Sequence, residues 1–147
     1  GNLRGTVFDL PAAVEQALPL IQSSRAAARL TTAAGDFFHD PLPEADLYAV
    51  GRILHDWSET KIRRLLARIH AALPPGGGLL IAEALLDEDH SGPLAAQMQS
   101  LNMLVITEGK ERTASQYRAL LEAAGFTDVE ARRTGAPLDA VLAIRKE

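Results

Sequence analysis

The segment of residues 52–57, RILHDW, places an imidazole directly beside a carboxylate. His55 follows a short apolar run and precedes a helical pattern, and Asp56 is its neighbour. A carboxylate that binds one imidazole nitrogen fixes the tautomer and stabilises the protonated ring, which is what a general base requires. A lone histidine in such a position is more often structural, so both interpretations stay open. A metal site is less favoured, because no second histidine follows at ligand spacing.

Two further segments could bind a nucleoside. Asp9 follows the apolar run TVF, where its carboxylate could accept two ribose hydroxyls side by side or cap the helix that Pro11 begins. In GDFF, residues 35–38, Asp36 could accept from the amine of an adenine while Phe37 offers it a flat apolar face. The same residues suit a turn whose aromatic side chains plug the edge of a sheet. The residues alone do not decide between these interpretations.

Two other conspicuous segments indicate turns rather than sites. The glycines of PPGGG, residues 74–78, follow a helical pattern and precede an apolar run, whereas a phosphate-binding loop leads from a strand into a helix. We therefore interpret this segment as a helix stop and a turn. TEGKERT, residues 107–113, gathers four charged residues before a helical pattern, which usually means a solvated helix start, here with Thr113 as the cap.

The elements that would hold these side chains alternate between strands and helices. We expect strands at residues 5–9, 29–33, 46–50, 79–85, 127–131 and 138–144, and helices from residue 11 and at 58–73, 93–105 and 113–124. This alternation predicts an α/β fold with a largely parallel sheet. Ligands bind beyond the carboxyl ends of such strands, so Asp9, the GDFF loop, His55 and Glu83 should gather at one edge.

The composition is that of an ordinary globular protein with one domain. The 147 residues carry a net charge of −4, which argues against a nucleic-acid or anionic-membrane partner because both require a basic surface. No apolar run is long enough to span a bilayer and no secretory signal is visible, so we expect a cytoplasmic protein. The absence of cysteine excludes disulfides and thiolate chemistry. The chain begins without methionine, close to its first expected strand, and reads as a piece of a larger protein.

Taken together, the motifs resemble one family along nearly the whole chain. VFDLP, GDFFHDPLP, RILHDW, SLNMLVITEGKERT and LLEAAGF occur in the order found in the small-molecule O-methyltransferases that use S-adenosylmethionine. The stretch from LLDED through GPL to SLNMLV is most similar to acetylserotonin O-methyltransferases and acetylserotonin O-methyltransferase-like proteins. The resemblance implies a Rossmann-like methyltransferase sheet that is mostly parallel, has an antiparallel C-terminal strand, and lacks the first strand and the glycine-rich loop. It also implies that residues 1–147 are part of a methyltransferase catalytic domain.

The resemblance implies a role for each candidate residue. His55 matches the base that deprotonates an aromatic hydroxyl of a small, N-acetylserotonin-like acceptor, and Glu83 and Glu111 match the acids that flank this histidine. Asp56 and Asn102 match positions that face the acceptor. The residues that resemble contacts to S-adenosylmethionine are Asp9, Gly35, Asp36, Phe37 and Arg52. The family also implies a homodimer for the full-length parent.

Two departures from the family keep a second interpretation open. Ile106 stands where acetylserotonin methyltransferases usually have a glutamine, and the glycine-rich loop and an N-terminal helical domain are expected upstream of Gly5. The alternative is a catalytically silent methyltransferase-like domain that serves in binding or assembly. A dinucleotide-binding fragment of a dehydrogenase would explain Asp9 after a strand, but neither HDW nor GKERT.

Overall fold

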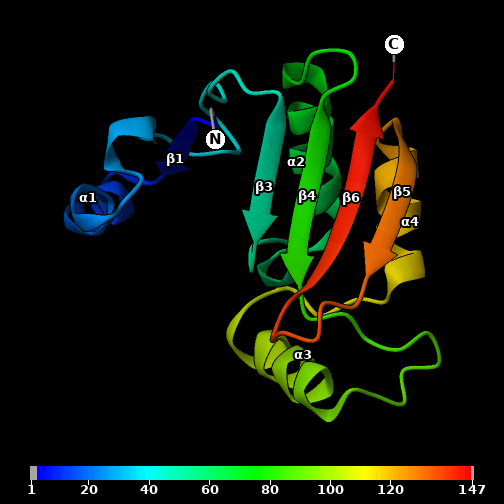
Figure 1. Ribbon diagram of the computed structural model, residues 1–147. Helices are drawn as coiled ribbons and strands as arrows, with labels where there is room; N and C mark the ends of the chain where they lie inside the picture. Colours follow the sequence, from blue (N-terminus) through cyan, green and yellow to red (C-terminus); the bar gives the residue numbers. More distant parts are fainter. Residues whose placement is uncertain (1–2, 147) are drawn as a thin grey trace. The chain divides into compact units, whose positions relative to one another are not determined.

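The computed structural model describes residues 3–146, which belong to two compact units. Unit 1 ends at Glu44 and unit 2 begins at Ala45. Each unit has a β-sheet of its own, with two strands in unit 1 and four in unit 2 (Figure 1). Within the described residues, no helix is both long enough and apolar enough to cross a membrane.

Unit 1 is a single strand–helix–strand motif. Strand β1 (Gly5–Asp9) leads into helix α1 (Pro11–Ser23), and a short 3-10 turn, η1 (Ala27–Arg29), precedes strand β2 (Leu30–Ala34). The two strands pair in parallel, which requires a crossover connection such as α1. Pro11 begins α1 as predicted, because the first helical turn does not need its missing N–H. The helix continues through Pro19, although a proline inside a helix removes one backbone hydrogen bond.

Unit 2 contains the longer α/β arrangement. Its elements are β3 (Leu47–Gly51), the 3-10 turn η2 (Leu54–Asp56), α2 (Glu59–Ala72), β4 (Gly78–Glu83), α3 (Leu94–Ile106), α4 (Ala114–Ala123), β5 (Phe126–Arg132) and β6 (Asp139–Arg145). The strand order is β3-β4-β6-β5. Strand β3 runs parallel to β4, whereas β6 is antiparallel to both β4 and β5. Only the C-terminal strand is therefore reversed, which confirms the mostly parallel sheet with an antiparallel last strand.

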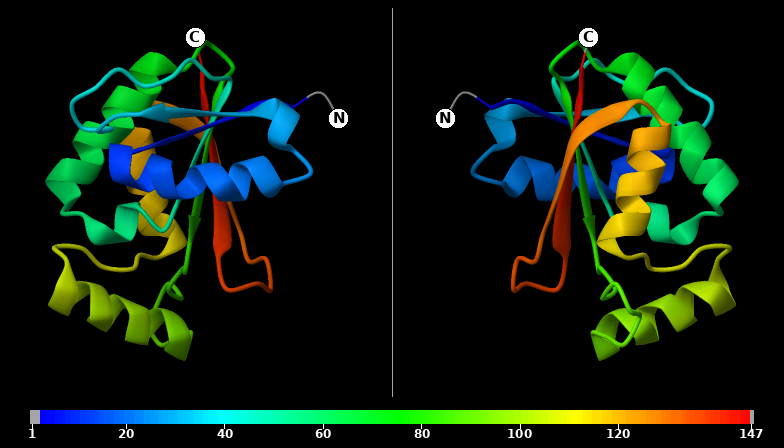
Figure 2. Two further views of the ribbon diagram at one scale, coloured as in Figure 1. Left: turned by 90° about the vertical axis from the view of Figure 1, so that its left-hand side faces the viewer. Right: turned by 90° about the vertical axis from the view of Figure 1, so that its right-hand side faces the viewer.

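The core of unit 2 lies between the sheet and helices α2 and α4, which cover the same face (Figures 1 and 2). Alternate residues of β4 point into this core, and α2 contributes a buried face at helical spacing. The fully buried apolar side chains here include Ile62, Leu65, Leu66, Ile69, Leu79, Ile81, Val141 and Ala143. The segment PPGGG is a turn between α2 and β4, as predicted, and Gly76 has a φ of 80° in it.

The carboxyl ends of β3 and β4 lie at one edge of the four-stranded sheet, and helix α3 lies across that edge (Figure 1). The turn η2 follows β3 at this edge, and Glu83 is the last residue of β4. Within residues 3–146, β1 pairs only with β2, and β3 pairs only with β4. Within this part of the chain, one edge of β1 and one edge of β3 are therefore without a partner strand.

Candidate active site

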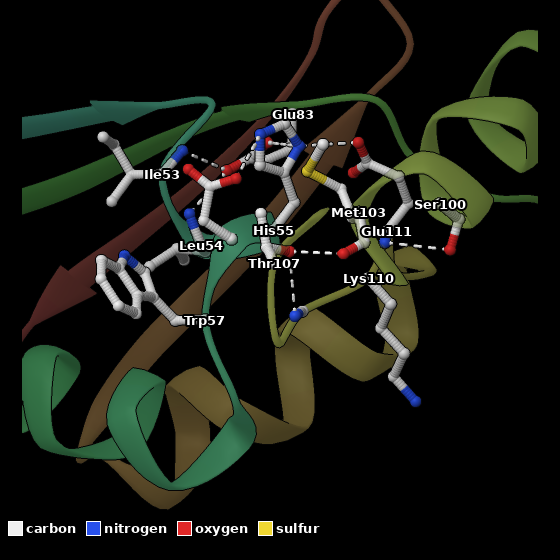
Figure 3. A network of polar contacts seen from close by, with 12 residues as sticks. Ile53, Leu54, His55, Trp57, Glu83, Ser100, Met103, Thr107, Lys110 and Glu111 are labelled. Carbon is white, nitrogen blue, oxygen red and sulfur yellow. Dashed lines mark hydrogen bonds and ion pairs between the residues drawn. The ribbon is translucent and has the colours of Figure 1, made fainter. Parts of the chain in front are cut away.

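The imidazole of His55 is buried in the turn η2 and held by two carboxylates (Figure 3). Its Nδ1 atom lies 2.7 Å from Oε1 of Glu111 and 3.2 Å from Oε2 of Glu83. Because a carboxylate only accepts hydrogen bonds, Nδ1 carries a proton and donates a hydrogen bond to Oε1 of Glu111. The other ring nitrogen, Nε2, is left to exchange a proton with a ligand.

Glu83 fixes both the ring and the backbone that carries it. The carboxylate is fully buried, and its Oε1 accepts hydrogen bonds from the backbone N–H groups of Ile53 at 3.0 Å and Leu54 at 2.9 Å. This contact follows from the strand register, in which Gly51 of β3 lies opposite Ala82 of β4. The next residue of β4 therefore lies beside the chain that leaves β3, as the sequence predicted for Glu83.

Glu111 comes from the segment between α3 and α4. Its side chain is buried, and its backbone N–H donates to Oγ of Ser100 on α3 at 3.2 Å. Figure 3 shows Met103 of the same helix beside the ring of His55. The prediction of a solvated helix start is therefore wrong for Glu111, although Thr113 does cap α4 in a reciprocal pair of hydrogen bonds with Gln116.

The carboxylates raise the pKa of His55 above its ordinary value of 6.5. Burial disfavours the charged ring and acts downwards, but the hydrogen bond to Glu111 and the charges of Glu83, Glu111 and Asp56 outweigh it. Burial in turn raises the pKa of Glu83, against the opposing effects of the His55 charge and the two backbone N–H groups. The cluster thus stabilises a proton on the imidazole, which a base must accept during a reaction.

On the other side of the ring, Nε2 lies near a partly exposed carboxylate. Oδ1 of Asp56 lies 3.6 Å from Nε2, and the Asp56 side chain is 38% exposed whereas that of His55 is 4% exposed. His55, Glu83 and Glu111 could also supply three metal ligands, since their ligand atoms lie within 4.8 Å of one another. The 2.7 Å separation of Nδ1 and Oε1 favours a shared proton, because two ligands of a tetrahedral zinc ion lie about 3.4 Å apart.

The residues predicted on the cofactor side lie mostly in unit 1, where Asp9 and Gly35 meet. The backbone N–H of Gly35 donates to the carbonyl of Asp9 at 2.9 Å, at the carboxyl ends of β1 and β2. A side chain at Gly35 would place its Cβ 2.6 Å from the ring of Phe8, so that ring would have to move to admit one. Helix α1 has no side-chain cap, and Oδ1 of Asp9 accepts from the N–H of Leu10 at 2.7 Å. The capping interpretation of Asp9 is therefore wrong.

Asp36 organises a turn in the GDFF loop. Its Oδ1 accepts from the N–H of Phe38 at 2.7 Å, and its Oδ2 lies 2.9 Å from Nδ1 of His39. The rings of Phe37 and Phe38 meet edge to face with 4.7 Å between their centroids. The turn expected for this segment is thus present.

Arg52 and Asn102 have no part in the network around His55. Arg52 is exposed and adopts a φ of 56°, which is uncommon for a residue with a side chain, and its N–H donates to the carbonyl of Ala82 at 3.1 Å. Asn102 is exposed on α3. Sequence reasoning missed Ser100, which accepts from the N–H of Glu111. It also missed Gly109 and Arg112, which contact the backbone of the turn that carries His55. A glycine inside the charged run TEGKERT was the one available signal for such a close backbone approach.

A profile of the O-methyltransferase domain family matches residues 1–127. The acetylserotonin O-methyltransferase of Gallus gallus is 52% identical over 141 residues, which cover 96% of this chain and 40% of that protein. The chain therefore spans about two fifths of the length of such curated relatives.

Solved structures match the arrangement of the elements as well. The crystal structure of human N-acetylserotonin methyltransferase in complex with SAM has a TM-score of 0.92 and 50% sequence identity, and the match covers 98% of this chain and 41% of that one. An O-methyltransferase family 2 protein from Planctomyces limnophilus, in complex with apigenin, has a TM-score of 0.90 and 34% identity, covering 97% of this chain and 43% of that one.

Proposed function

The chain belongs to the O-methyltransferase domain family, and on this premise we propose that it carries the catalytic base of an S-adenosylmethionine-dependent O-methyltransferase. The acceptor is an aromatic hydroxyl of a small, N-acetylserotonin-like molecule. One observation carries the proposal, namely a buried imidazole whose Nδ1 is held by Glu111 and Glu83 while Nε2 faces Asp56. Residues 1–147 would then be part of a methyltransferase catalytic domain, consistent with the two fifths of each relative that they match.

The proposed step is a proton transfer coupled to attack by oxygen. Nε2 of His55 accepts the proton of the acceptor hydroxyl, and the oxygen becomes nucleophilic as that proton leaves. S-adenosylmethionine, when bound, would supply the methyl group on its sulfonium sulfur, with the C–S bond breaking as the C–O bond forms and S-adenosylhomocysteine leaving as a neutral thioether. The protein therefore has two tasks, which are to hold the partners in line and to provide the base.

The two glutamates prepare His55 for this transfer. Glu111 keeps the Nδ1–H tautomer, so that the lone pair of the neutral ring lies on Nε2. Glu83 holds the turn η2 through the N–H groups of Ile53 and Leu54 while its second oxygen approaches the ring. Both carboxylates stabilise the imidazolium that forms when the proton arrives.

Residues of unit 1 are chemically suited to the cofactor. The exposed carboxylate of Asp9 at the end of β1 could accept hydrogen bonds from both ribose hydroxyls. Gly35, which has no side chain, would leave room for the cofactor beside Asp9. Asp36 and Phe37 would serve the adenine, and Arg52 would make a further contact. On the acceptor side we assign Asp56 and Asn102, of which Asp56 has the support of its position near Nε2.

The names of the matched proteins support an aromatic acceptor. The human structure is an N-acetylserotonin methyltransferase, and the Planctomyces limnophilus protein was solved with apigenin. The proposal includes a homodimer for the full-length protein and a cytoplasmic location. Isothermal calorimetry with S-adenosylhomocysteine, and with NAD as the control nucleotide, tests cofactor use. We expect binding of the former alone, and binding of NAD instead would contradict the proposal.

A catalytically silent domain with a role in binding or assembly is the second candidate. Helix α3 favours it, because this helix exposes a set of large apolar side chains: Leu94, Met98, Leu101, Leu104, Val105 and Ile106. Failure to bind either S-adenosylhomocysteine or NAD would support this candidate over the enzyme.

A further inference from the structure

The segment that delivers Glu111 to the imidazole crosses directly over the turn that carries His55. We call residues 107–113 the strap. At one end the N–H of Thr107 donates to the carbonyl of Met103 at 2.8 Å, and at the other the carbonyl of Arg112 accepts from the N–H of Leu86 at 3.0 Å. The strap is thus anchored at α3 and at the chain that follows β4. Between these anchors, the N–H of Glu111 also donates to Oγ of Ser100 at 3.2 Å.

Gly109 allows the strap to lie against the backbone of the turn. A Cβ atom at this position would lie 2.0 Å from the carbonyl oxygen of His55 and 2.7 Å from the carbonyl carbon of Asp56. Such a contact involves backbone on both sides, so no rotation of a side chain would relieve it. The next contact along the strap is long, with 3.4 Å between the N–H of Glu108 and the carbonyl of Asp56. Position 109 therefore requires glycine, because the backbone of His55 and Asp56 occupies the space that a Cβ atom would take.

Arg112 ties the strap to both sides of His55. Its guanidinium is buried, and Nη1 donates to the carbonyl of Lys110 at 3.0 Å and to that of Leu54 at 3.3 Å. Nη2 reaches the carbonyl of Trp57 at 3.5 Å. One planar fork thus joins the strap to carbonyls on either side of His55. An ammonium group could not reproduce this, because it is a point charge without a rigid fork.

The polar contacts on the exposed side of the strap are weaker candidates for holding it against the turn that carries His55. Lys61 pairs with Glu108 and lies 4.6 Å from the ring centroid of Trp57. Lys61 and Glu108 are both more than 40% exposed, and exposed ion pairs contribute little to stability. The buried contacts of Gly109 and Arg112 therefore dominate the placement of the strap.

We propose that Gly109 and Arg112 are positioning residues that clamp the strap onto the His55 turn, so that the carboxylate of Glu111 meets Nδ1 of the imidazole. Neither residue touches the reacting atoms. Their part in the reaction rests on the proposed function, but the clamp itself is a property of the folded chain. It can therefore be measured without cofactor or acceptor.

The test is an NMR titration of the imidazole rings in the 147-residue chain. His55 is assigned with a His55→Ala spectrum, and the other histidines (His39, His70 and His90) serve as internal references. In Gly109→Ala and in Arg112→Lys, which keeps the charge, we expect the pKa of His55 to fall towards 6.5. The Nδ1–H proton signal should be lost as the contact with Glu111 opens.

Two substitutions of the same kinds provide matched controls. At Gly51 a Cβ would make only ordinary contacts of 3.6–3.7 Å, and Arg118 lies exposed on α4, so Gly51→Ala and Arg118→Lys should leave the titration unchanged. A wild-type pKa for His55 in a folded Arg112→Lys or Gly109→Ala chain would overturn the proposal, even with a lower melting temperature. If Gly109→Ala does not fold, Arg112→Lys decides alone. Absence of methyl transfer would leave this result untouched and would count only against the proposed function.

Discussion

Nδ1 of His55 and Oε1 of Glu111 lie 2.7 Å apart, although the two residues are separated by 56 positions in the sequence. The contact decides which nitrogen carries the proton in the neutral ring and which one can accept another. It also explains why the pKa of a buried histidine rises, since burial alone would lower it. The tautomer and the pKa of His55 should therefore depend on Glu111.

The rate of methyl transfer should increase with pH as His55 loses its proton, because only the neutral ring accepts one from the acceptor. Since the pKa of His55 lies above 6.5, this increase should occur above that pH. Glu111→Gln removes a charge and a charge-assisted bond that both raise the pKa, so the rising limb should move to lower pH while the plateau falls. The measurement is kcat/KM against pH, and a shift to higher pH would contradict this account.

Glu83 should be important for stability because its buried carboxylate accepts from two backbone N–H groups. Glu83→Ala leaves both donors unpaired, at about 1–3 kcal/mol each. Glu83→Gln keeps an oxygen acceptor of the same shape and should retain most of the free energy of unfolding. Urea denaturation of both variants at pH 7 measures the difference, and equal losses would contradict the assignment.

The pH dependence of the free energy of unfolding should reveal the raised pKa of Glu83. Its pKa in the folded chain lies above 4.5, so the folded state binds more protons than the unfolded state between 4.5 and that pKa. The stability that protonated Glu83 contributes is therefore present below pH 4.5 and is lost as pH rises through the folded pKa. The free energy of unfolding of the wild type should fall relative to Glu83→Gln over this range, whereas a constant difference would contradict the raised pKa.

Two glycines have a positive φ but different surroundings, so alanine substitutions at these positions can distinguish the cost of backbone strain from that of a steric clash. Gly135 has a φ of 74°, and a Cβ there would meet no atom within 4 Å, so Gly135→Ala should cost only the backbone strain of about 1–2 kcal/mol. Gly125 follows α4 with a φ of 94°, and a Cβ there would lie 3.0 Å from Nε2 of His70. Gly125→Ala should therefore lower the free energy of unfolding more than Gly135→Ala does. The reverse order in urea denaturation would contradict this.

Asp9 should affect cofactor binding without affecting the base. Two charge-assisted hydrogen bonds to ribose hydroxyls contribute about 1.5–3 kcal/mol each, so Asp9→Ala should weaken binding of S-adenosylhomocysteine by at least about tenfold. Glu15→Ala, an exposed acid on α1 of the same unit, is the matched control and should bind normally. Calorimetry compares the three chains. Equal affinity in Asp9→Ala would remove Asp9 from the cofactor site.

Local patterns were sufficient to predict the elements of the fold. Strand β1 matches the expected residues 5–9, and Gly125 ends α4 as a left-handed residue because glycine has no Cβ. Helix α1 begins at Pro11 as expected and continues through Pro19 to Ser23. The strand register placed Glu83 beside the chain after β3, which adjacency in an α/β sheet made predictable.

The burial of the strap could not be predicted from local sequence. Charged residues before a helix are usually solvated, yet Glu111 and Arg112 are buried because an imidazole and backbone carbonyls from a distant turn satisfy them. That information resides in tertiary contacts, so only the family resemblance indicated Glu111. The left-handed φ of Arg52 was equally invisible, since nothing in its side chain favours that conformation.

The most direct test of the account compares turnover and cofactor binding in His55→Ala, made in the complete protein of which we propose this chain to be a part. Loss of a general base should reduce methyl transfer by about 10²–10⁴-fold. The affinity for S-adenosylhomocysteine should remain that of the wild type, because His55 is proposed to contact the hydroxyl of the acceptor and not the cofactor. Undiminished turnover, or an equal loss of turnover and affinity, would contradict the assignment of His55 as the base.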